Sequence, residues 1–197
     1  MKTLVLASRN KDKIKELQHI LIDLGIELKS ALDFGDLEEV AEDAETLEGN
    51  ALKKANYVHK MTGLPAVADD TGLEVDALDG APGVYSARYA GEDVTYQDNL
   101  NKLLQEMKDV ENGQRDARFR TVVAFVNDDT TSTFEGICPG NILKESKGNG
   151  GFGYDPVFQP EGYEKTFAEL SPEEKNKISH RGKAIREFVE WLKDRKD

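Results

Sequence analysis

Residues 8–13, SRNKDK, combine side chains that are suited to binding a phosphate group. They lie between a short apolar run and a helical pattern, where free backbone N–H groups and the helix dipole favour an anion. Ser8 and Asn10 add short polar donors, and the side chain of Lys13 is long enough to reach a phosphate oxygen. The glycines and the Lys-Ser/Thr pair of a Walker A loop are absent. Taken alone, the segment is also compatible with an ordinary surface helix whose lysines are solvated.

Two adjacent aspartates, Asp69 and Asp70, followed by Thr71, form a second candidate. The apolar run at 65–68 predicts a short strand that ends just before them, and ligands of α/β sheets bind beyond the carboxyl ends of strands. Side chains alternate along an extended backbone, so one aspartate can face a ligand while the other is held by backbone or a lysine. Mg²⁺ prefers one or two carboxylates together with substrate phosphates and water. A turn without any ligand is the alternative, because Asp and Gly favour turns.

A glycine-rich stretch and a basic segment further along the chain form the third candidate. Residues 147–153 hold four glycines, which predicts a tightly turned loop. Phe152 and Tyr154 offer aromatic faces on which a purine could stack, although a hairpin without a ligand is equally compatible. Groups that could contact a base edge or supply charge follow at Asp155, Lys175, His180 and Arg181. The last two are predicted at the start of a helix, where cations are unfavourable unless an anion or an electronegative base edge lies opposite.

Composition restricts the kind of partner. The chain has 197 residues, the size of a single domain, and a net charge of −12. A surface this acidic repels a long polyanion, so we expect no stable nucleic-acid partner, whereas a small anion can bind where cations converge. No apolar run approaches the roughly 20 residues of a membrane-spanning helix, so we expect no membrane partner. The single cysteine, Cys138, cannot form an intramolecular disulfide, which is typical of a cytoplasmic protein.

The elements that position these residues follow from the spacing of apolar side chains. Residues 3–7, TLVLA, are apolar from Leu4 onward, which predicts a strand buried on both faces. Apolar residues at helical spacing over 14–24 predict a helix that stops at Gly25, and Thr46 is the predicted N-cap of a second helix. Together the elements predict an α/β protein with a mixed sheet, forming one domain over 1–197. Three further helices are predicted: one over 95–107, one that begins after an N-cap at Ser171, and one around 185–192. Two further strands are predicted over 119–126 and 130–136.

Several segments together resemble the inosine triphosphate pyrophosphatase family, also called the non-standard purine nucleoside triphosphate pyrophosphatases. Each segment is modest alone, but they occur in the order and spacing of the family and span nearly the whole chain. The resemblance implies an elongated, two-lobed fold, with a mixed central sheet flanked by helices, and a homodimer. The matching segments are SRNKDK at 8–13, TLEGNALKKA at 46–55, ADDTGLEVDAL at 68–78, GAPGVYSARYAG at 80–91, GFGYDPVF at 151–158 and EEKNKISHRGKA at 173–184.

The resemblance implies roles for the residues near the phosphates. Asp70 would be the general base that activates water and also a Mg²⁺ ligand, with Asp69 and Glu42 as further acidic groups of the metal site. Lys54 matches a lysine of the phosphate region, and Thr71 would touch the substrate. The loop that holds the triphosphate would consist of Ser8, Arg9, Asn10, Lys11, Asp12 and Lys13.

A pocket for the purine base is implied in the later part of the chain. Inosine and xanthine carry a 6-keto acceptor, which His180 or Arg181 can satisfy with a donor. Adenine carries a 6-amino donor, which would face another donor, and an unpaired buried donor costs about 1–3 kcal/mol. The pocket residues would be Phe152, Gly153, Tyr154, Asp155, Lys175, His180 and Arg181.

The implied activity is Mg²⁺-dependent hydrolysis of ITP, dITP and XTP to the monophosphate and pyrophosphate. It would cleanse the nucleotide pool and prevent incorporation of these nucleotides into DNA and RNA. Two other functions remain open. One is a catalytically silent nucleotide-binding or sensor protein, although paired carboxylates do not help to bind an anion unless a metal intervenes. The other is a pyrophosphatase of modified pyrimidine nucleotides, which product analysis with a nucleotide panel would distinguish.

Overall fold

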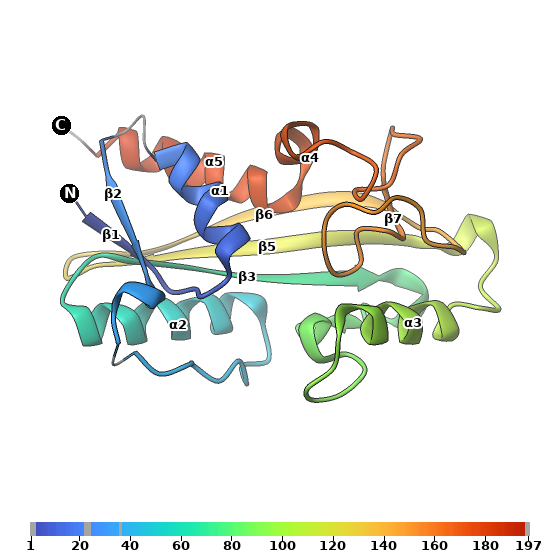
Figure 1. The fold of residues 1–197 in the computed structure, drawn as a ribbon, viewed down its shortest axis with the longest axis horizontal. Coiled ribbons are helices and arrows are strands. Elements are labelled where there is room, and N and C mark those ends of the chain that lie inside the picture. The colour runs from blue at the N-terminus through green and yellow to red at the C-terminus, as the bar shows by residue number, and fades with distance from the viewer. Residues whose placement is uncertain (1–2, 22–24, 36, 196–197) are drawn as a thin grey trace. The chain divides into compact units, whose positions relative to one another are not determined.

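A computed structural model describes residues 3–21, 25–35 and 37–195 of the protein; the side chains of Asp12, Glu16, His19 and Ile20 lie outside this description. Its helices are α1 (Lys11–Leu21), α2 (Leu47–Thr62), α3 (Tyr96–Glu106), α4 (Pro172–Ile178) and α5 (His180–Lys193) (Figure 1). Its strands are β1 (Thr3–Leu6), β2 (Glu27–Ser30), β3 (Ala66–Val75), β4 (Pro82–Gly83), β5 (Asp116–Val126), β6 (Thr131–Ile142) and β7 (Phe158–Pro160). Single 3-10 turns lie at Ala31–Asp33, Asp76–Leu78, Ser86–Arg88 and Asn112–Gln114.

The strands form one mixed sheet. Their order is β2-β1-β3-β5-β6-β7, and β4 pairs with β3 off this path. β1 is parallel to β2 and to β3, with Leu6 beside Ser30 and Val67, whereas β3–β4 and β6–β7 are antiparallel. The predicted α/β protein with a mixed sheet and flanking helices is therefore confirmed. None of the helices in the described part is both long and apolar enough to cross a membrane.

The chain divides into two compact units, each of which has its own core. The first comprises the described residues within 1–70, 122–135 and 184–197, and the second comprises residues 71–121 and 136–183. The division falls inside β3, β5, β6 and α5, so each of these elements contributes residues to both units.

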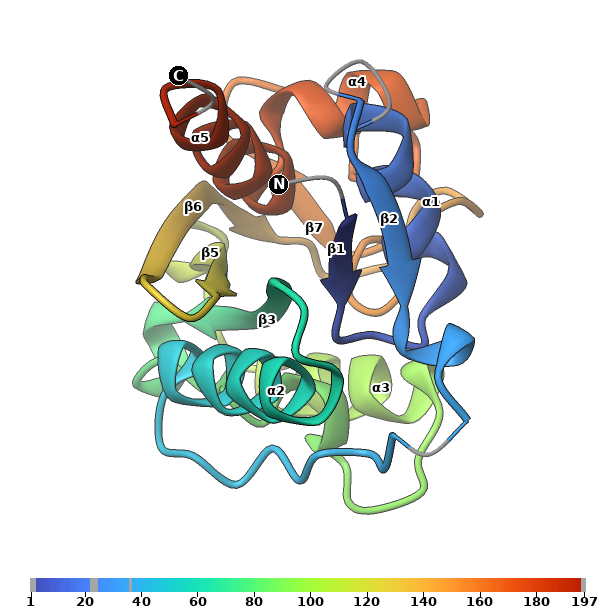
Figure 2. The same cartoon turned by 90° about the vertical axis from the view of Figure 1, so that its left-hand side faces the viewer.

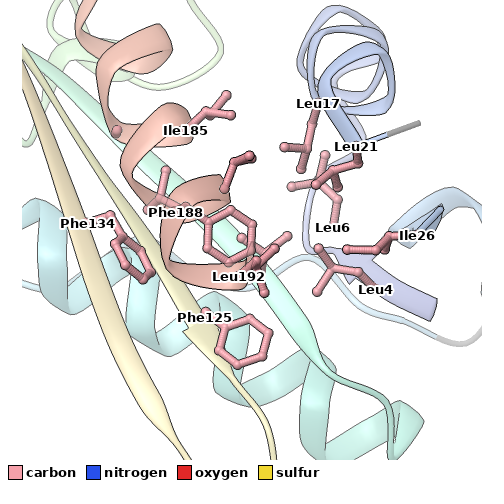
Figure 3. Close-up of a cluster of buried hydrophobic side chains, with 14 residues drawn as sticks. Leu4, Leu6, Leu17, Leu21, Ile26, Phe125, Phe134, Ile185, Phe188 and Leu192 are labelled. Atoms are coloured by element: carbon pink, nitrogen blue, oxygen red, sulfur yellow. The ribbon is translucent and has the colours of Figure 1, made fainter. Parts of the chain in front are cut away.

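In the first unit, helices lie on both faces of the strands (Figure 2). Side chains alternate along β1, so Leu4 and Leu6 face one side and Val5 faces the other. The first side packs against α1 and against Phe188 of α5 in a fully apolar cluster (Figure 3). Val5 packs instead with Val58 of α2. Because α2 lies on this second side, its sheet-facing residues can reach polar side chains of β3.

In the second unit, α3 packs onto strand residues through one apolar stripe. Leu100 and Leu103 of this helix join a core that contains Phe119 of β5 and Phe158 of β7. Tyr154 belongs to the same core, although it follows directly on the glycine-rich loop. The loop is therefore anchored to the core at its C-terminal end.

The elements predicted from apolar spacing are mostly confirmed. Thr46 caps α2 by accepting a hydrogen bond from the Gly49 N–H group. Ser171 caps α4 and forms a capping box with Glu174. The strands over 119–126 and 130–136 are present but longer, as β5 and β6. The end of the predicted first helix, at residues 22–24, lies outside the described residues.

One predicted boundary is wrong. The strand predicted over 65–68 continues through both aspartates to Val75, so Asp69 and Asp70 lie within β3 and not after it. The sequence Asp-Asp-Thr-Gly favours a turn only when its carboxylates have no better partners. Here both carboxylates contact lysine side chains, and the backbone remains extended.

Candidate active site

Asp70 of β3 is a buried carboxylate with two polar partners. Its Oδ2 accepts a hydrogen bond from Nδ2 of Asn50 (3.0 Å), and its Oδ1 lies 3.5 Å from Nζ of Lys54. Asn50 and Lys54 are four residues apart on α2, so they project from the same face of that helix. Asp70 is only 7% exposed, so its interactions with these partners replace most of its contact with water.

The Lys54 ammonium lies among three oxygen acceptors. It pairs with Oε1 of Glu42 and donates to the main-chain carbonyl of Asp69 (2.8 Å), besides its contact with Asp70. Burial is the largest single effect and lowers the pKa of Lys54, but the charges of the three carboxylates together leave that pKa raised. Lys54 is therefore a charged ammonium at neutral pH, placed between two carboxylates.

The basicity of Asp70 is set mainly by its burial. Burial raises the pKa of Asp70 above its ordinary value and outweighs the opposite effect of the Lys54 charge. Repulsion by Glu42 raises this pKa further, whereas Asn50 and Lys13 lower it. A carboxylate with a raised pKa is a better proton acceptor, which is the property that a general base needs.

The carboxylate of Asp69 has a different partner, because its Oδ2 lies 2.8 Å from Nζ of Lys13. Neighbouring residues of a strand project to opposite faces, so Asp69 and Asp70 do not face the same way. Within 3–21, 25–35 and 37–195, no three or more His, Cys, Asp or Glu side chains are grouped so that they could hold a metal ion. The predicted metal set of Asp70, Glu42 and Asp69 remains a prediction. Asp70 and Glu42 are the two carboxylates whose side chains contact Lys54, whereas the Asp69 carboxylate contacts Lys13.

The predicted phosphate loop joins β1 to α1. Ser8 Oγ accepts a hydrogen bond from the Asn10 N–H group (3.1 Å), and Asn10 Oδ1 accepts one from the Lys13 N–H group (3.3 Å). These side chains cap backbone donors that we expected to face an anion. The Lys13 side chain crosses to Asp69, which brings one cation of the loop to the acidic residues of β3.

The other loop residues are less closely tied to these carboxylates. The guanidinium of Arg9 donates to the carbonyl oxygen of Leu37, and Lys11 is exposed. The side chain of Asp12 lies outside the described residues. Their predicted contacts with a triphosphate remain predictions.

In the second unit, the glycine-rich loop folds around the carboxylate of Asp155. Its Oδ2 accepts a hydrogen bond from the Phe152 N–H group (2.9 Å) and lies 2.5 Å from Nζ of Lys175. Glycine is needed at 151, because a Cβ there would lie 2.1 Å from the same oxygen and the φ angle of Gly151 is +71°. Asp155 is thus a buried anchor that fixes the loop and one lysine together.

Cationic groups approach the ring of Phe152 within this loop. Nζ of Lys175 lies 4.8 Å from the ring centroid, and Cζ of Arg181 lies 5.7 Å from it. The ring of Tyr96, at the start of α3, lies 6.1 Å away. The structure therefore brings together Phe152, Asp155, Lys175 and Arg181, four of the residues predicted for a base pocket.

Two other predicted pocket residues lie within the core. Tyr154 is 4% exposed, and its hydroxyl group donates to the carbonyl oxygen of Ser86 (2.8 Å). The expected open aromatic face of Tyr154 is therefore not found, because the ring and the hydroxyl group both have partners in the core. His180 begins α5 as predicted, but its ring is buried and stacks on Phe119 with centroids 4.6 Å apart.

The remaining predicted contacts are Thr71 and Gly153. The hydroxyl groups of Thr71 and Thr121 lie 2.6 Å apart and share a hydrogen bond. Gly153 has a φ angle of +62°, with open space where a side chain would begin. Their predicted contacts with the substrate remain predictions.

Comparison with known proteins assigns the chain to a family, because residues 4–191 match the Ham1 family. The chain belongs to the Ham1 family. The dITP/XTP pyrophosphatase of Flavobacterium psychrophilum is 52% identical over 191 residues, which cover 97% of this chain and 99% of that protein. The dITP/XTP pyrophosphatase of Escherichia coli is 47% identical over 197 residues, covering 98% and 100%. The family recognised from the sequence segments is therefore confirmed.

Solved structures agree with this assignment. A HAM1 protein from Coxiella burnetii superimposes with a TM-score of 0.92 at 40% identity, covering 98% of this chain and 100% of that chain. The Ham1 protein of Staphylococcus aureus gives a TM-score of 0.91 at 38% identity, covering 99% and 100%. The arrangement of strands and helices described above is thus that of Ham1 proteins.

Sequence reasoning missed one residue of this Ham1 site, Asn50. It lies three residues after Leu47 and directly before Ala51, on the buried stripe of α2. A single amide within an apolar stripe needs hydrogen-bond partners inside the protein. That amide was the available signal, but the sequence alone could not identify Asp70 as its partner.

Proposed function

We propose that this Ham1 protein is a nucleoside-triphosphate pyrophosphatase. It hydrolyses non-standard purine nucleoside triphosphates such as dITP, XTP and ITP to the monophosphate and pyrophosphate. Relatives named dITP/XTP pyrophosphatase, close to half identical over nearly the whole chain, support this activity. In the cytoplasm, it would cleanse the nucleotide pool and prevent incorporation of these nucleotides into DNA and RNA.

The observation that carries the proposal is the arrangement of Asp70, Glu42 and Lys54. Placing the buried Asp70 carboxylate and the Lys54 ammonium beside each other, next to the partly exposed Glu42, is costly, and a fold gains little stability from it. The pKa values of Asp70 and Lys54 are both raised, and perturbed titratable groups are concentrated at functional sites. A protein that only bound an anion would gain nothing from carboxylates at the binding site, which favours an enzyme over a silent sensor.

The donor set fits a divalent cation, which we propose to be Mg²⁺. Asp70 and Glu42 already share one cation, the ammonium of Lys54. Mg²⁺ is bound in proteins by one or two carboxylates, completed by phosphate oxygens and water. Held by Asp70 and Glu42, it would polarise the phosphoryl oxygens of the substrate.

The side chains of the first unit would carry out hydrolysis between the α- and β-phosphates. Asp70 orients a water molecule and takes its proton while the water oxygen attacks the α-phosphorus. The bond from the α-phosphorus to the bridging oxygen breaks, and pyrophosphate leaves with the electron pair. Lys13 and Lys54 neutralise the charge that develops on the departing group.

The residues around Phe152 in the second unit would bind the base. The half-buried ring of Phe152 offers a surface for stacking, while Arg181 offers donors for a 6-keto oxygen. Lys175 is held in place by Asp155. His180 and Arg181 are both buried, but the His180 ring stacks on Phe119 whereas the guanidinium of Arg181 approaches the Phe152 ring, which makes Arg181 the stronger candidate for contact with the base edge.

We also propose that the protein is a homodimer, which rests on the family resemblance. Sedimentation equilibrium measures the mass of the assembly directly. A mass twice that of one chain is the expected result, and a mass of one chain at micromolar concentration would contradict the proposal.

A nucleotide panel with product analysis tests the activity. The purified protein is incubated with Mg²⁺ and with dITP, XTP, ITP, ATP, GTP or modified pyrimidine triphosphates, and pyrophosphate and orthophosphate are assayed separately. We expect pyrophosphate from the first three, and no turnover in excess chelator. Nucleoside diphosphate and orthophosphate as primary products would refute the proposal. Preferential turnover of pyrimidine nucleotides would instead indicate a different pyrophosphatase.

A further inference from the structure

The side chain of the fully buried Asn50 makes two hydrogen bonds, one to Asp70 and one to the segment that follows Glu42. From these contacts we infer that Asn50 is a positioning residue for the reaction. It sets the plane of the Asp70 carboxylate and fixes the position of the Glu42 segment relative to it. The inference deepens the proposed function and rests on it, because Asp70 and Glu42 are the acidic groups of the proposed site.

The orientation of the Asn50 amide follows from the chemistry of its two partners. Its Oδ1 accepts a hydrogen bond from the Ala44 N–H group (2.9 Å), which can only donate. Its Nδ2 must therefore face Asp70 Oδ2 (3.0 Å), which as a carboxylate can only accept. Donor and acceptor are satisfied in one orientation only, so the amide cannot flip without losing both bonds.

These two bonds connect three separate parts of the chain. Asn50 lies on α2, Asp70 on β3, and Ala44 in the irregular segment two residues after Glu42. With Oδ2 of Asp70 held by the amide, Oδ1 is the oxygen that faces Lys54. Asn50 thus determines which oxygen of Asp70 faces the cations, and it restrains the backbone near the second carboxylate.

Other side chains cannot reproduce this pair of contacts. An aspartate at position 50 would keep the acceptor for the Ala44 N–H group but place a second carboxylate against Asp70. A leucine has nearly the same size but supplies neither donor nor acceptor, so two buried polar groups would lose their partner. A serine is too short to span both contacts. Asn50→Asp therefore tests the loss of the donor, Asn50→Leu the loss of both hydrogen bonds, and Asn50→Ser the effect of a side chain too short to make both contacts.

The experiment compares Asn50→Leu, Asn50→Asp and Asn50→Ser with the wild type. Asn56→Leu and Asn56→Asp are matched controls, because Asn56 is an exposed residue of the same helix whose side chain bonds only locally, to the carbonyl of Leu52. We measure kcat and KM for dITP at saturating Mg²⁺, and thermal unfolding in chelator. We also measure Mn²⁺ binding without nucleotide by the decrease in the electron paramagnetic resonance signal of free Mn²⁺.

We expect kcat of the Asn50 variants to fall by about 10²-fold, with KM changed by less than about threefold, because misplacement of a reacting group by about 1 Å has an effect of this size. Mn²⁺ binding should weaken at least fivefold in Asn50→Leu. Both Asn56 controls should match the wild type in all three measurements. In an Asp70→Asn background, Asn50→Leu should cause no further loss of kcat, because the group that it positions is already absent.

Three results would overturn the inference. One is wild-type kcat and Mn²⁺ binding in a cooperatively folded Asn50→Leu or Asn50→Ser protein. Another is a further full loss of kcat in the Asp70→Asn background. The third is loss of cooperative unfolding in all three Asn50 variants, which would assign the residue a structural role. Failure of the proposed function would give a different result, because the wild type itself would then hydrolyse no nucleotide. The comparison of Mn²⁺ binding between the wild type and the Asn50 variants would still test the inference in that case.

Discussion

The replacement Asp70→Asn tests the central assignment, because it changes charge while keeping shape. The amide can still accept a hydrogen bond from Asn50, but it cannot take a proton from water. Its own NH₂ group would then face the ammonium of Lys54, which lies 3.5 Å from Asp70 Oδ1. Loss of a general base alone lowers the rate by about 10²–10⁴. Loss of a metal ligand acts in the same direction, so we expect kcat to fall by at least about 10³.

The same variant should keep its fold, and the pKa of Asp70 gives the sign of the stability change. Burial raises this pKa above the ordinary value of 3.8, so the folded protein favours the protonated form. The stabilising contribution of Asp70 is complete below pH 3.8 and is lost as the pH rises through the folded pKa. The amide does not titrate. We therefore expect Asp70→Asn to unfold at the same or a higher temperature than the wild type at neutral pH, and the difference to shrink toward pH 3.8.

The assay measures kcat for dITP by pyrophosphate release with Mg²⁺, and thermal unfolding in chelator at several pH values. Asp69→Asn is the matched control, because this neighbour faces Lys13 on the other side of β3. We expect the kcat of Asp69→Asn to be at least about tenfold higher than the kcat of Asp70→Asn. Near wild-type turnover in a folded Asp70→Asn protein would refute the assignment of the base. A variant that unfolds at lower temperature only at neutral pH would refute the sign of the pKa argument.

Three further substitutions test separate parts of the site. Lys54→Met should abolish most turnover. It should also strengthen Mn²⁺ binding without nucleotide by at least about fivefold, because it removes the cation that Glu42 and Asp70 share. Equal or weaker Mn²⁺ binding in a titration would contradict this. Gly151→Ala should raise KM for dITP about tenfold and leave inhibition by tripolyphosphate unchanged, since it displaces the loop around Asp155 and not the phosphate residues. Arg181→Ala should lower the ITP-to-ATP ratio of kcat/KM about tenfold, whereas an unchanged ratio would remove its role at the base.

The parts of the fold that depend on local interactions could be predicted from the sequence. Thr46 and Ser171 were recognised as caps because the groups that they bind lie three residues further along the chain. The helical spacing of apolar residues in α1 and α5 likewise predicts which face of each helix is buried. Local hydrogen bonds and helical spacing need no knowledge of the tertiary structure.

Features that depend on distant partners could not be predicted in this way. The apolar run at 65–68 predicts a strand that ends just before Asp69 and Asp70, but β3 continues through both residues, whose carboxylates contact lysines of α1 and α2. Asn50 and Asp70 are 20 residues apart, and the sequence does not show that they meet. The ring of Tyr154 was expected to be open, yet its hydroxyl group bonds to Ser86, 68 residues away. In each case a tertiary contact overrode a local preference.

An acidic protein can bind a triphosphate if its own charges are arranged to admit a cation first. Glu42, Asp69 and Asp70 carry one more charge than Lys13 and Lys54 can neutralise, so this part of the first unit repels a bare triphosphate. If Glu42 and Asp70 held a divalent cation, as we propose, the added positive charge would reverse that balance, and Lys54 would lose its place between the two carboxylates. The ammonium of Lys54 could then pair with a phosphate oxygen of the nucleotide. Binding of the cation and binding of the nucleotide would therefore strengthen each other by the same factor, as linkage requires.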